Sequence, residues 1–330
     1  MDAPHPLAAA EFSLSPHGGN TKRSAWYHAH SVWKYESPLA DLEMLESAPE
    51  VKRIMNRLPD AVIDWNIPSQ FSLWTAGNLS ALAAEMPQRS PLRSSGMYPA
   101  LDVAVLWAMV RSARPRRIIE IGAGTTTTVI SAARRANAEQ EQLIGVGGSS
   151  RASDDGGAAL CEAAARVSGG DQSLPRVGSG CHVCVEPFRV AAIAESDVVV
   201  LPSRIQTVPL ALFDHLGRDD ILFIDSSHVL QPYGDTLFEL LWILPRLKPG
   251  VLVHVHDIFL PFDYPAAWTE AGERQYTEQY VLAALLNGSE DTWEVVFATH
   301  MLLRSRPELF REIGLSEDEL NGGSLWLRKK

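Results

Sequence analysis

The sequence lacks several features, and each absence excludes a class of protein. No apolar run approaches the roughly 20 residues that a membrane-spanning helix needs, so no contact with a membrane is expected. Basic residues are outnumbered, with 29 Lys and Arg against 40 Asp and Glu and a formal net charge of −11. A protein that binds nucleic acid normally shows a basic face, so nucleic acid is not an expected partner. No internal repeat is apparent.

Cysteine is scarce, and 3 residues are too few for a disulfide framework. The first residues, MDAPHPLAAAEF, have no basic start followed by an apolar stretch, so no secretion signal is visible. Both observations predict a cytoplasmic protein. Cys181 and Cys184 form a C-x-x-C pattern that could be a metal knuckle or a redox pair. We favour an ordinary strand, because positions three apart in a strand point to opposite faces and no second pair completes a zinc site.

The chain is long enough for one large domain with additions or for two domains, and its hydrophobic fraction of 46% is that of a globular protein. Residues 1–24 are rich in Pro, Gly, Ser and His and are expected to be mobile. Apolar residues at helical spacing predict a helical cap over 25–95. The main domain then covers 96–330, with an insertion at 146–180 that is dense in Gly and Ser. This insertion could be a lid, but a tolerated surface loop is the more ordinary interpretation.

After a buried helix that ends before Pro115, short apolar runs alternate with helical segments. The predicted strands are RRIIEIG, CHVCVEP, DVVVLP, DILFID, GVLVHVH, TWEVVFATHML and SLWLRK. Continuous Val, Ile and Leu runs separated by helices indicate an α/β fold with a doubly wound parallel sheet that is covered on both faces. No long helix separates the last two strands, so they can pair antiparallel at the sheet edge.

RRIIEIGAGTTTTV is the most informative stretch. A strand ends at Glu120, the chain turns through Gly122 and Gly124, and a helix begins in the Thr run with Thr125 and Thr126. Glycines let the backbone approach a ligand, and free N–H groups at the helix start can hold its polar groups. Dinucleotide-binding proteins show G-x-G-x-x-G, but the third position here is Thr127. Proteins that bind S-adenosylmethionine use E/D-x-G-x-G, and we favour this ligand because the carboxylate of Glu120 suits its ammonium group.

Two further residues are predicted to bind the same ligand. Glu186 ends the next strand, where an acid commonly holds ribose hydroxyls, although an exposed strand-end Glu is the simpler alternative. Gln206 follows the third strand and could face the adenine edge through its amide.

Together these residues resemble the class I S-adenosylmethionine-dependent methyltransferases, and they are most similar to a large bacterial group of small-molecule methyltransferases. The blocks that carry the resemblance are ILFIDSSHV, LPRLKPGVLVHVHDIFLPFDYP, EQYVLAALL and SLWLRK. The match covers roughly residues 96–330. It implies a Rossmann-like sheet of seven strands with the last one antiparallel, and a ligand across the carboxyl ends of the strands. It implies no particular substrate.

FIDSSHV and VLVHVHDIF place polar residues at the ends of two strands that neighbour each other in the family topology. Ligands of doubly wound sheets bind outside the carboxyl ends of the strands, so Asp225, His228, His256 and Asp257 are expected to converge beside the methyl donor. His228 is the candidate general base, because the usual pKa of histidine is near neutral. Alternatively Asp225, His256 and Asp257 hold a divalent metal such as Fe, Mn or Mg, which would lower the pKa of a substrate hydroxyl.

Other residues near these strand ends allow two interpretations each. His254 is expected to be a hydrogen-bonded core residue rather than a ligand, and His300, placed on the sixth strand, could contact metal or substrate. Tyr98 could line the substrate pocket or belong to the core. The aromatic segment 259–268 could wall that pocket or form a packing or homodimer surface.

The sequence therefore predicts a cytoplasmic methyltransferase that acts on a small molecule, with transfer to oxygen favoured. Three alternatives remain open. An NAD-dependent oxidoreductase would use the same sheet, another enzyme could break a different bond of S-adenosylmethionine, for instance by cyclising its aminobutyryl arm, and a non-catalytic module could bind the same ligand.

Overall fold

The computed structural model of the chain describes residues 47–58, 63–89, 98–143, 156–168, 180–188, 197–269 and 274–330. The chain divides into two compact units, residues 1–49 and 50–330. Only 47–49 of the first unit are described, so the predicted mobile segment 1–24 lies outside the described residues. The account below concerns the second unit.

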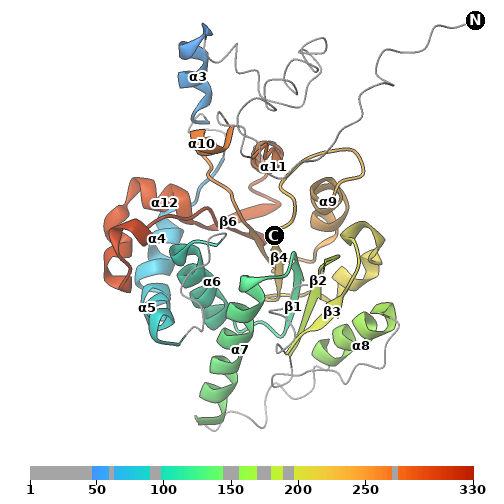
Figure 1. Ribbon diagram of the computed structural model, residues 1–330. Coiled ribbons are helices and arrows are strands. Elements are labelled where there is room, and N and C mark those ends of the chain that lie inside the picture. Colours follow the sequence, from blue (N-terminus) through green and yellow to red (C-terminus); the bar gives the residue numbers. More distant parts are fainter. Residues whose placement is uncertain are drawn as a thin grey trace, which may run out of the picture. The chain divides into compact units, whose positions relative to one another are not determined.

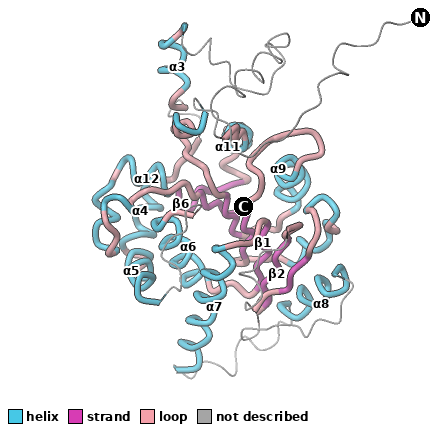
Figure 2. The backbone as a smooth tube through the Cα atoms, viewed as in Figure 1, coloured by secondary structure: helices cyan, strands magenta, loops and turns pink. Residues whose placement is uncertain are grey.

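One sheet of seven strands forms the centre of this unit, in the order β3-β2-β1-β4-β5-β7-β6. The strands are β1 (Arg117–Ile121), β2 (Cys181–Val185), β3 (Val199–Leu201), β4 (Ile221–Ile224), β5 (Leu252–Val255), β6 (Trp293–Ala298) and β7 (Leu325–Lys329). The first five pair in parallel, whereas β7 is antiparallel to both β5 and β6. Figure 2 shows the strands at the centre with helices around them. All seven predicted strands and the antiparallel last strand are confirmed.

Helices cover both faces of the sheet because the central strands are apolar on both sides. Helices α6 (Ala100–Ala113) and α7 (Thr125–Leu143) pack together on one face, while α8 (Gly156–Ser168) and α9 (Asp235–Phe238) lie on the other side (Figure 1). Helix α6 is the most deeply buried, since all residues from Ala100 to Arg111 are shielded from solvent.

Three helices of the described residues precede α6: α3 (Pro49–Met55), α4 (Ile67–Thr75) and α5 (Leu79–Arg89). Helix α5 packs on α6, and Trp74 of α4 stacks on Phe297 of β6 with 5.4 Å between ring centroids. These two helices therefore share the core of the sheet. The domain boundaries at 24/25 and 95/96 stay predictions.

The predicted insertion contains a helix that belongs to the core. Leu160 and Cys161 of α8 are fully buried, and α8 packs on β2 and β3. Cys161 forms a disulfide with Cys181 of β2, a bond that the low cysteine count did not lead us to expect. Cys184 is free and buried, so Cys181 and Cys184 do not form a pair of their own. Residues 144–155 and 169–179 of this region lie outside the described residues.

The later helical segments are less regular than expected. PLALFDHL forms a 3₁₀ helix over Leu210–His215, and the segment after α9 continues as a π-helical turn, Glu239–Ile243, and a 3₁₀ turn, Leu244–Arg246. The remaining α-helices in the described part of the chain are α10 (Ala266–Thr269), α11 (Glu278–Leu286) and α12 (Thr299–Ser305), and short 3₁₀ helices cover Ile205–Thr207, Pro307–Ile313 and Glu317–Glu319. Among the described residues, no helix is both long enough and apolar enough to cross a bilayer.

Candidate active site at the carboxyl ends of β4 and β5

The ends of β4 and β5 bring two imidazoles to one carboxylate. Oδ1 of Asp225 lies 3.2 Å from Nε2 of His228 and 3.3 Å from Nδ1 of His256. Both histidines are buried, whereas 27% of the Asp225 side chain is exposed. The strands that carry these residues are parallel neighbours, which explains why their ends meet. The expected convergence of the two strand ends is therefore observed.

Each imidazole turns its second nitrogen to another buried carboxylate. Nδ1 of His228 lies 2.9 Å from Oε2 of Glu278, in α11. Nε2 of His256 lies 3.5 Å from Oδ2 of Asp102, in α6. The side chains of Glu278 and Asp102 are both 0% exposed. The cluster thus has one carboxylate at its open side and one behind each imidazole.

Asp257 completes the cluster on a second side. Its carboxylate lies 3.7 Å from Nδ1 of His256 and 3.9 Å from Nε2 of His228. Both Asp257 and His228 have left-handed backbone conformations, with φ of 54° and 59°. Non-glycine residues in this region are uncommon and concentrate at functional sites. Gly323 permits this arrangement, because a Cβ there would lie 3.3 Å from the Asp257 Cα.

The charges of the cluster are coupled. Burial alone would raise the pKa of Asp225, but the two imidazoles outweigh it and lower that pKa well below its usual value. Burial would lower the pKa of His228, yet its hydrogen bonds to Asp225 and Glu278 raise it. Asp225 and Asp102 likewise outweigh burial at His256 and raise its pKa to about 10. For Asp257, burial is the larger effect and raises the pKa despite the imidazoles.

This geometry favours one chemical role and argues against another. A carboxylate with two histidines is a ligand set for divalent transition metals, and the ligand atoms of Asp225, His228 and His256 all lie within 4.8 Å of one another. Buried carboxylates behind the imidazoles are the partners that metal-binding histidines usually have. Both nitrogens of His228 face carboxylates, so in this conformation neither is free to accept a proton from a substrate.

The glycine turn lies directly beside this cluster. A Cβ on Gly122, whose φ is +83°, would lie 1.9 Å from the carbonyl oxygen of Asp225. Gly122 is therefore required by the close contact between β1 and β4. At Gly124, by contrast, a Cβ would meet no atom within 4 Å. The fold itself therefore does not require glycine at this position. A ligand that approaches the backbone of the turn would require it, because a side chain would fill that space.

The other predicted donor-binding residues surround this turn. Glu186 accepts hydrogen bonds from the backbone N–H groups of Ala123, at 3.1 Å, and Phe188, at 2.7 Å, so it holds the turn in place. Gln206 lies elsewhere on the same edge and donates to the carbonyl of Tyr233 at 2.8 Å. Thr125 begins α7 and is half-buried. Their contacts with a donor stay predictions.

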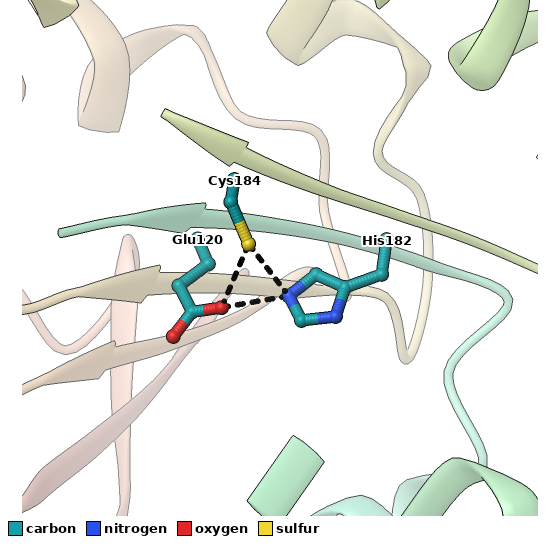
Figure 3. Close-up of side chains that lie close together, drawn as sticks. All are labelled: Glu120, His182 and Cys184. Atoms are coloured by element: carbon teal, nitrogen blue, oxygen red, sulfur yellow. Dashed lines mark hydrogen bonds and ion pairs between the residues drawn. The ribbon is translucent and has the colours of Figure 1, made fainter. Parts of the chain in front are cut away.

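Glu120 is placed differently from the other predicted residues, because its side chain is fully buried and points toward His182 and Cys184 (Figure 3). Its carboxylate accepts hydrogen bonds from the hydroxyl of Thr126 at 2.6 Å, Nε2 of His182 at 2.8 Å and the thiol of Cys184 at 3.1 Å. Burial lowers the pKa of His182 and raises that of Cys184, so the imidazole is neutral and the sulfur keeps its proton. Although these ligand types could hold a metal, the carboxylate is satisfied without one. Its burial argues against the predicted contact between Glu120 and the donor's ammonium group.

Three other expectations concern aromatic and histidine residues near the cluster. His254 is a core residue packed on Phe223, at 4.1 Å between centroids, but neither of its nitrogens has a hydrogen-bond partner among the described residues, so the expected hydrogen bond is absent. His300 lies in the first turn of α12 rather than in β6, and its Nδ1 is 3.1 Å from the carbonyl of Gly322. Tyr98 is buried and stacks on His256 at 4.4 Å.

Sequence reasoning missed Asp102 and Glu278. Asp102 carried a usable signal, because it is the only acidic residue in the apolar run ALDVAVLWAMV. A charge inside such a buried helix needs a partner. Its carboxylate also accepts hydrogen bonds from the backbone of Gly323 and Ser324, at 2.8 and 3.1 Å. Glu278 carried no comparable signal, since an acid at the start of a helix is common.

Comparison with known proteins adds one informative match. Residues 119–258 match the family model described as a methyltransferase domain. Among solved structures, the chain is similar to the SAH-bound methyltransferase PaMTH1 of Podospora anserina, with 13% identity, 96% of this chain and 100% of that chain covered, and a TM-score of 0.37. At this identity and TM-score, the similarity supports no inference about the present chain. No curated protein matches the chain significantly.

Proposed function

Because residues 119–258 match a methyltransferase domain, we propose that the protein uses S-adenosylmethionine to methylate a hydroxyl of a small molecule held at Asp225, His228 and His256. The observation that carries the proposal is the pairing of each imidazole with two carboxylates. One nitrogen of each ring faces Asp225, and the other faces buried Glu278 or Asp102.

The donor's position is inferred from the glycine turn. The open space at Gly124 leaves room for a ligand next to the backbone, and the first N–H groups of α7 follow directly. The donor is S-adenosylmethionine, which supplies a methyl group on a sulfonium. The further residues that we assign to its binding are Gly122, Thr125, Glu186, Gln206 and Asp225. The contact between Gly122 and Asp225 joins the donor and acceptor sides of the site.

The cluster at Asp225 is assigned to a divalent transition metal such as Fe or Mn, because two of its three ligands are imidazoles and Mg²⁺ prefers oxygen ligands. We infer that its ligands are Asp225, His228 and His256. The predicted ligand set contained Asp257 in place of His228, and we now place Asp257 next to the ligands. Such an ion lowers the pKa of a hydroxyl that it binds. Glu278 and Asp102 fix the orientation of the two imidazoles. We prefer this arrangement to His228 as a free general base, because both nitrogens of His228 are occupied.

In the proposed reaction, the acceptor oxygen forms a bond to the methyl carbon while the bond from that carbon to sulfur breaks, and the electron pair goes to sulfur. The acceptor hydroxyl loses its proton to the carboxylate of Asp257, which is 10% exposed. The side chains must hold the oxygen about 3 Å from the carbon and in line with the breaking bond.

Two measurements on the purified chain test this function. Calorimetry is expected to show binding of S-adenosylhomocysteine and none of NADH, and the reverse would overturn the assignment. Incubation with labelled donor and a panel of hydroxylated small molecules is expected to give labelled product and S-adenosylhomocysteine. A donor product other than S-adenosylhomocysteine would indicate that another bond breaks.

Elemental analysis addresses the metal. About one equivalent is expected in the wild-type chain and far less in His256→Ala, whereas Cys184→Ser serves as the matched control that keeps its metal. A metal content that falls in Cys184→Ser but stays at the wild-type level in His256→Ala would place the ion at Glu120 instead.

A further inference from the structure

A cavity of about 400 Å³ adjoins the cluster and shares Asp257 with it. Six of its lining residues carry the argument, namely Asp257, Phe259, Trp268, Arg274, His300 and Arg304. A cavity of this size suits a small organic molecule. Because Asp257 also faces His228 and His256, a molecule in the cavity would lie next to the proposed reaction centre.

The aromatic walls of the cavity favour a flat ligand. The rings of Phe259 and Trp268 meet at 90° with centroids 5.2 Å apart, and the rings of Phe259 and His300 meet at 71° with centroids 5.0 Å apart. Phe259 thus contacts both other rings, and these contacts limit the rotation of its own ring. A planar ring in the cavity could therefore make both stacked and edge-to-face contacts, the two arrangements that aromatic pairs prefer.

Arg274 brings a positive charge to the same cavity. Its guanidinium carbon lies 4.0 Å from the centroid of the Trp268 ring, which holds the guanidinium plane. Its Nη1 lies 3.4 Å from Oδ2 of Asp257, and no other carboxylate among the described residues lies within 4.0 Å of it. A guanidinium has five N–H donors, so this one long contact leaves most of its capacity for a ligand.

Arg304 adds a second positive charge to the lining. Its guanidinium carbon lies 5.4 Å from the centroid of the Phe262 ring, and none of the described acidic residues forms an ion pair with it. The lining therefore holds two guanidinium groups and one carboxylate. In an otherwise acidic chain, this local excess of positive charge is a feature that an anionic ligand explains.

We propose that this cavity binds the methyl acceptor and that Arg274 selects an acceptor whose planar ring carries both a hydroxyl and a carboxylate. The ring lies against Phe259 and Trp268, the carboxylate pairs with Arg274, and the hydroxyl faces Asp257. This inference rests on the proposed function, since it names the substrate class of the same site. A guanidinium–carboxylate pair contributes both affinity and geometric specificity. We therefore expect the charge of the acceptor, rather than the shape of its ring, to decide which acceptor binds.

The test compares matched ligands on the full chain. Hydroxybenzoates, hydroxyphenylacetates and hydroxycinnamates are titrated beside their methyl esters, which keep the ring and lose the charge. Binding is measured by calorimetry in the presence of saturating S-adenosylhomocysteine. At least one acid is expected to bind about 10-fold tighter than its ester. In Arg274→Gln this preference is expected to fall below about 2-fold, and in Arg274→Lys to be intermediate.

Arg306→Gln is the control, because its side chain is 63% exposed and pairs with Glu308 away from the cavity. Thermal melts confirm that each variant folds. Equal binding of acids and esters by the wild-type chain, or a preference that survives in Arg274→Gln, would overturn the inference. Failure of every acid while S-adenosylhomocysteine still binds would overturn it and leave the proposed function standing. Failure of S-adenosylhomocysteine to bind would instead overturn the proposed function.

Discussion

Oε2 of Glu278 lies 2.9 Å from Nδ1 of His228, although 50 residues separate the two in the chain. The contact joins the start of α11 to the end of β4, and it is supported by hydrogen bonds from the backbone N–H groups of Thr277 and Glu278 to the carbonyl of His228. A carboxylate that is buried behind an imidazole fixes its orientation and increases its affinity for a metal. The pair therefore provides the most direct test of the proposed metal site.

Glu278→Gln is expected to reduce metal affinity by about 10- to 100-fold while donor binding stays within about 2-fold, because the amide keeps the shape of the side chain and removes its charge. Metal titration and calorimetry with S-adenosylhomocysteine measure the two effects. The matched control is Glu312→Gln, an exposed glutamate. Equal loss of both ligands would show that Glu278 supports the fold rather than the metal.

The two glycines of the turn are expected to respond differently to alanine. In Gly122→Ala the new Cβ would lie 1.9 Å from the carbonyl oxygen of Asp225, so we expect a loss of about 2 kcal/mol or more in the free energy of unfolding. In Gly124→Ala no atom lies within 4 Å of the new Cβ, so stability is expected to be kept. Donor affinity should fall in Gly124→Ala if the open space belongs to the ligand.

Urea unfolding and calorimetry separate these outcomes. If Gly124→Ala binds S-adenosylhomocysteine with wild-type affinity, the donor does not bind against this turn. A Gly122→Ala variant with unchanged stability would mean that β1 and β4 can separate at this point at little cost.

Most of the fold followed from the sequence because its strands are continuous apolar runs. ILFI and LVHV are buried along their whole length and RIIEI is buried from Ile118 onward, and this pattern identifies the interior of a parallel sheet. The convergence of Asp225 and His256 followed from the same topology, since parallel strands end at one edge. The irregular segments were harder to predict. PLALFDHL has helical spacing, yet its central residues, Leu210–His215, form a 3₁₀ helix, with which so short a segment is also compatible.

The sequence could indicate that a buried charge such as Asp102 needs a partner, but it could not identify which residue that partner is. Asp102 reaches His256 from α6, and Arg274 reaches Asp257 from the segment before α11. Their positions depend on how helices pack over the sheet ends, which local patterns do not specify. Glu120 illustrates the same limit at short range. Its motif predicts contact with a ligand, but a strand residue points to one face, and here that face is shared with His182 and Cys184.

The interior position of Glu120 makes its own prediction. Glu120→Ala would leave three buried donors without an acceptor, so we expect a loss of about 2–4 kcal/mol in the free energy of unfolding. Cys184→Ser keeps a donor at the same position and should cost less. If Glu120 instead contacts the donor, Glu120→Gln would retain stability and lose affinity for S-adenosylhomocysteine, and a comparison of urea midpoints with binding constants decides between the two roles.

The disulfide between Cys161 and Cys181 can be tested by counting thiols. Chain unfolded in guanidinium without reductant is expected to show one reactive thiol, that of Cys184, and three after reduction. The bond closes a loop across 20 residues and ties α8 to β2, so Cys161→Ser should cost about 2–4 kcal/mol in the free energy of unfolding. Because Cys161 and Cys181 form a single bond, Cys181→Ser should cost a similar amount, and the double variant should cost no more than either single one. Three thiols in the unreduced chain would show that the bond does not form, and additive losses in the double variant would show that the two side chains contribute by packing alone.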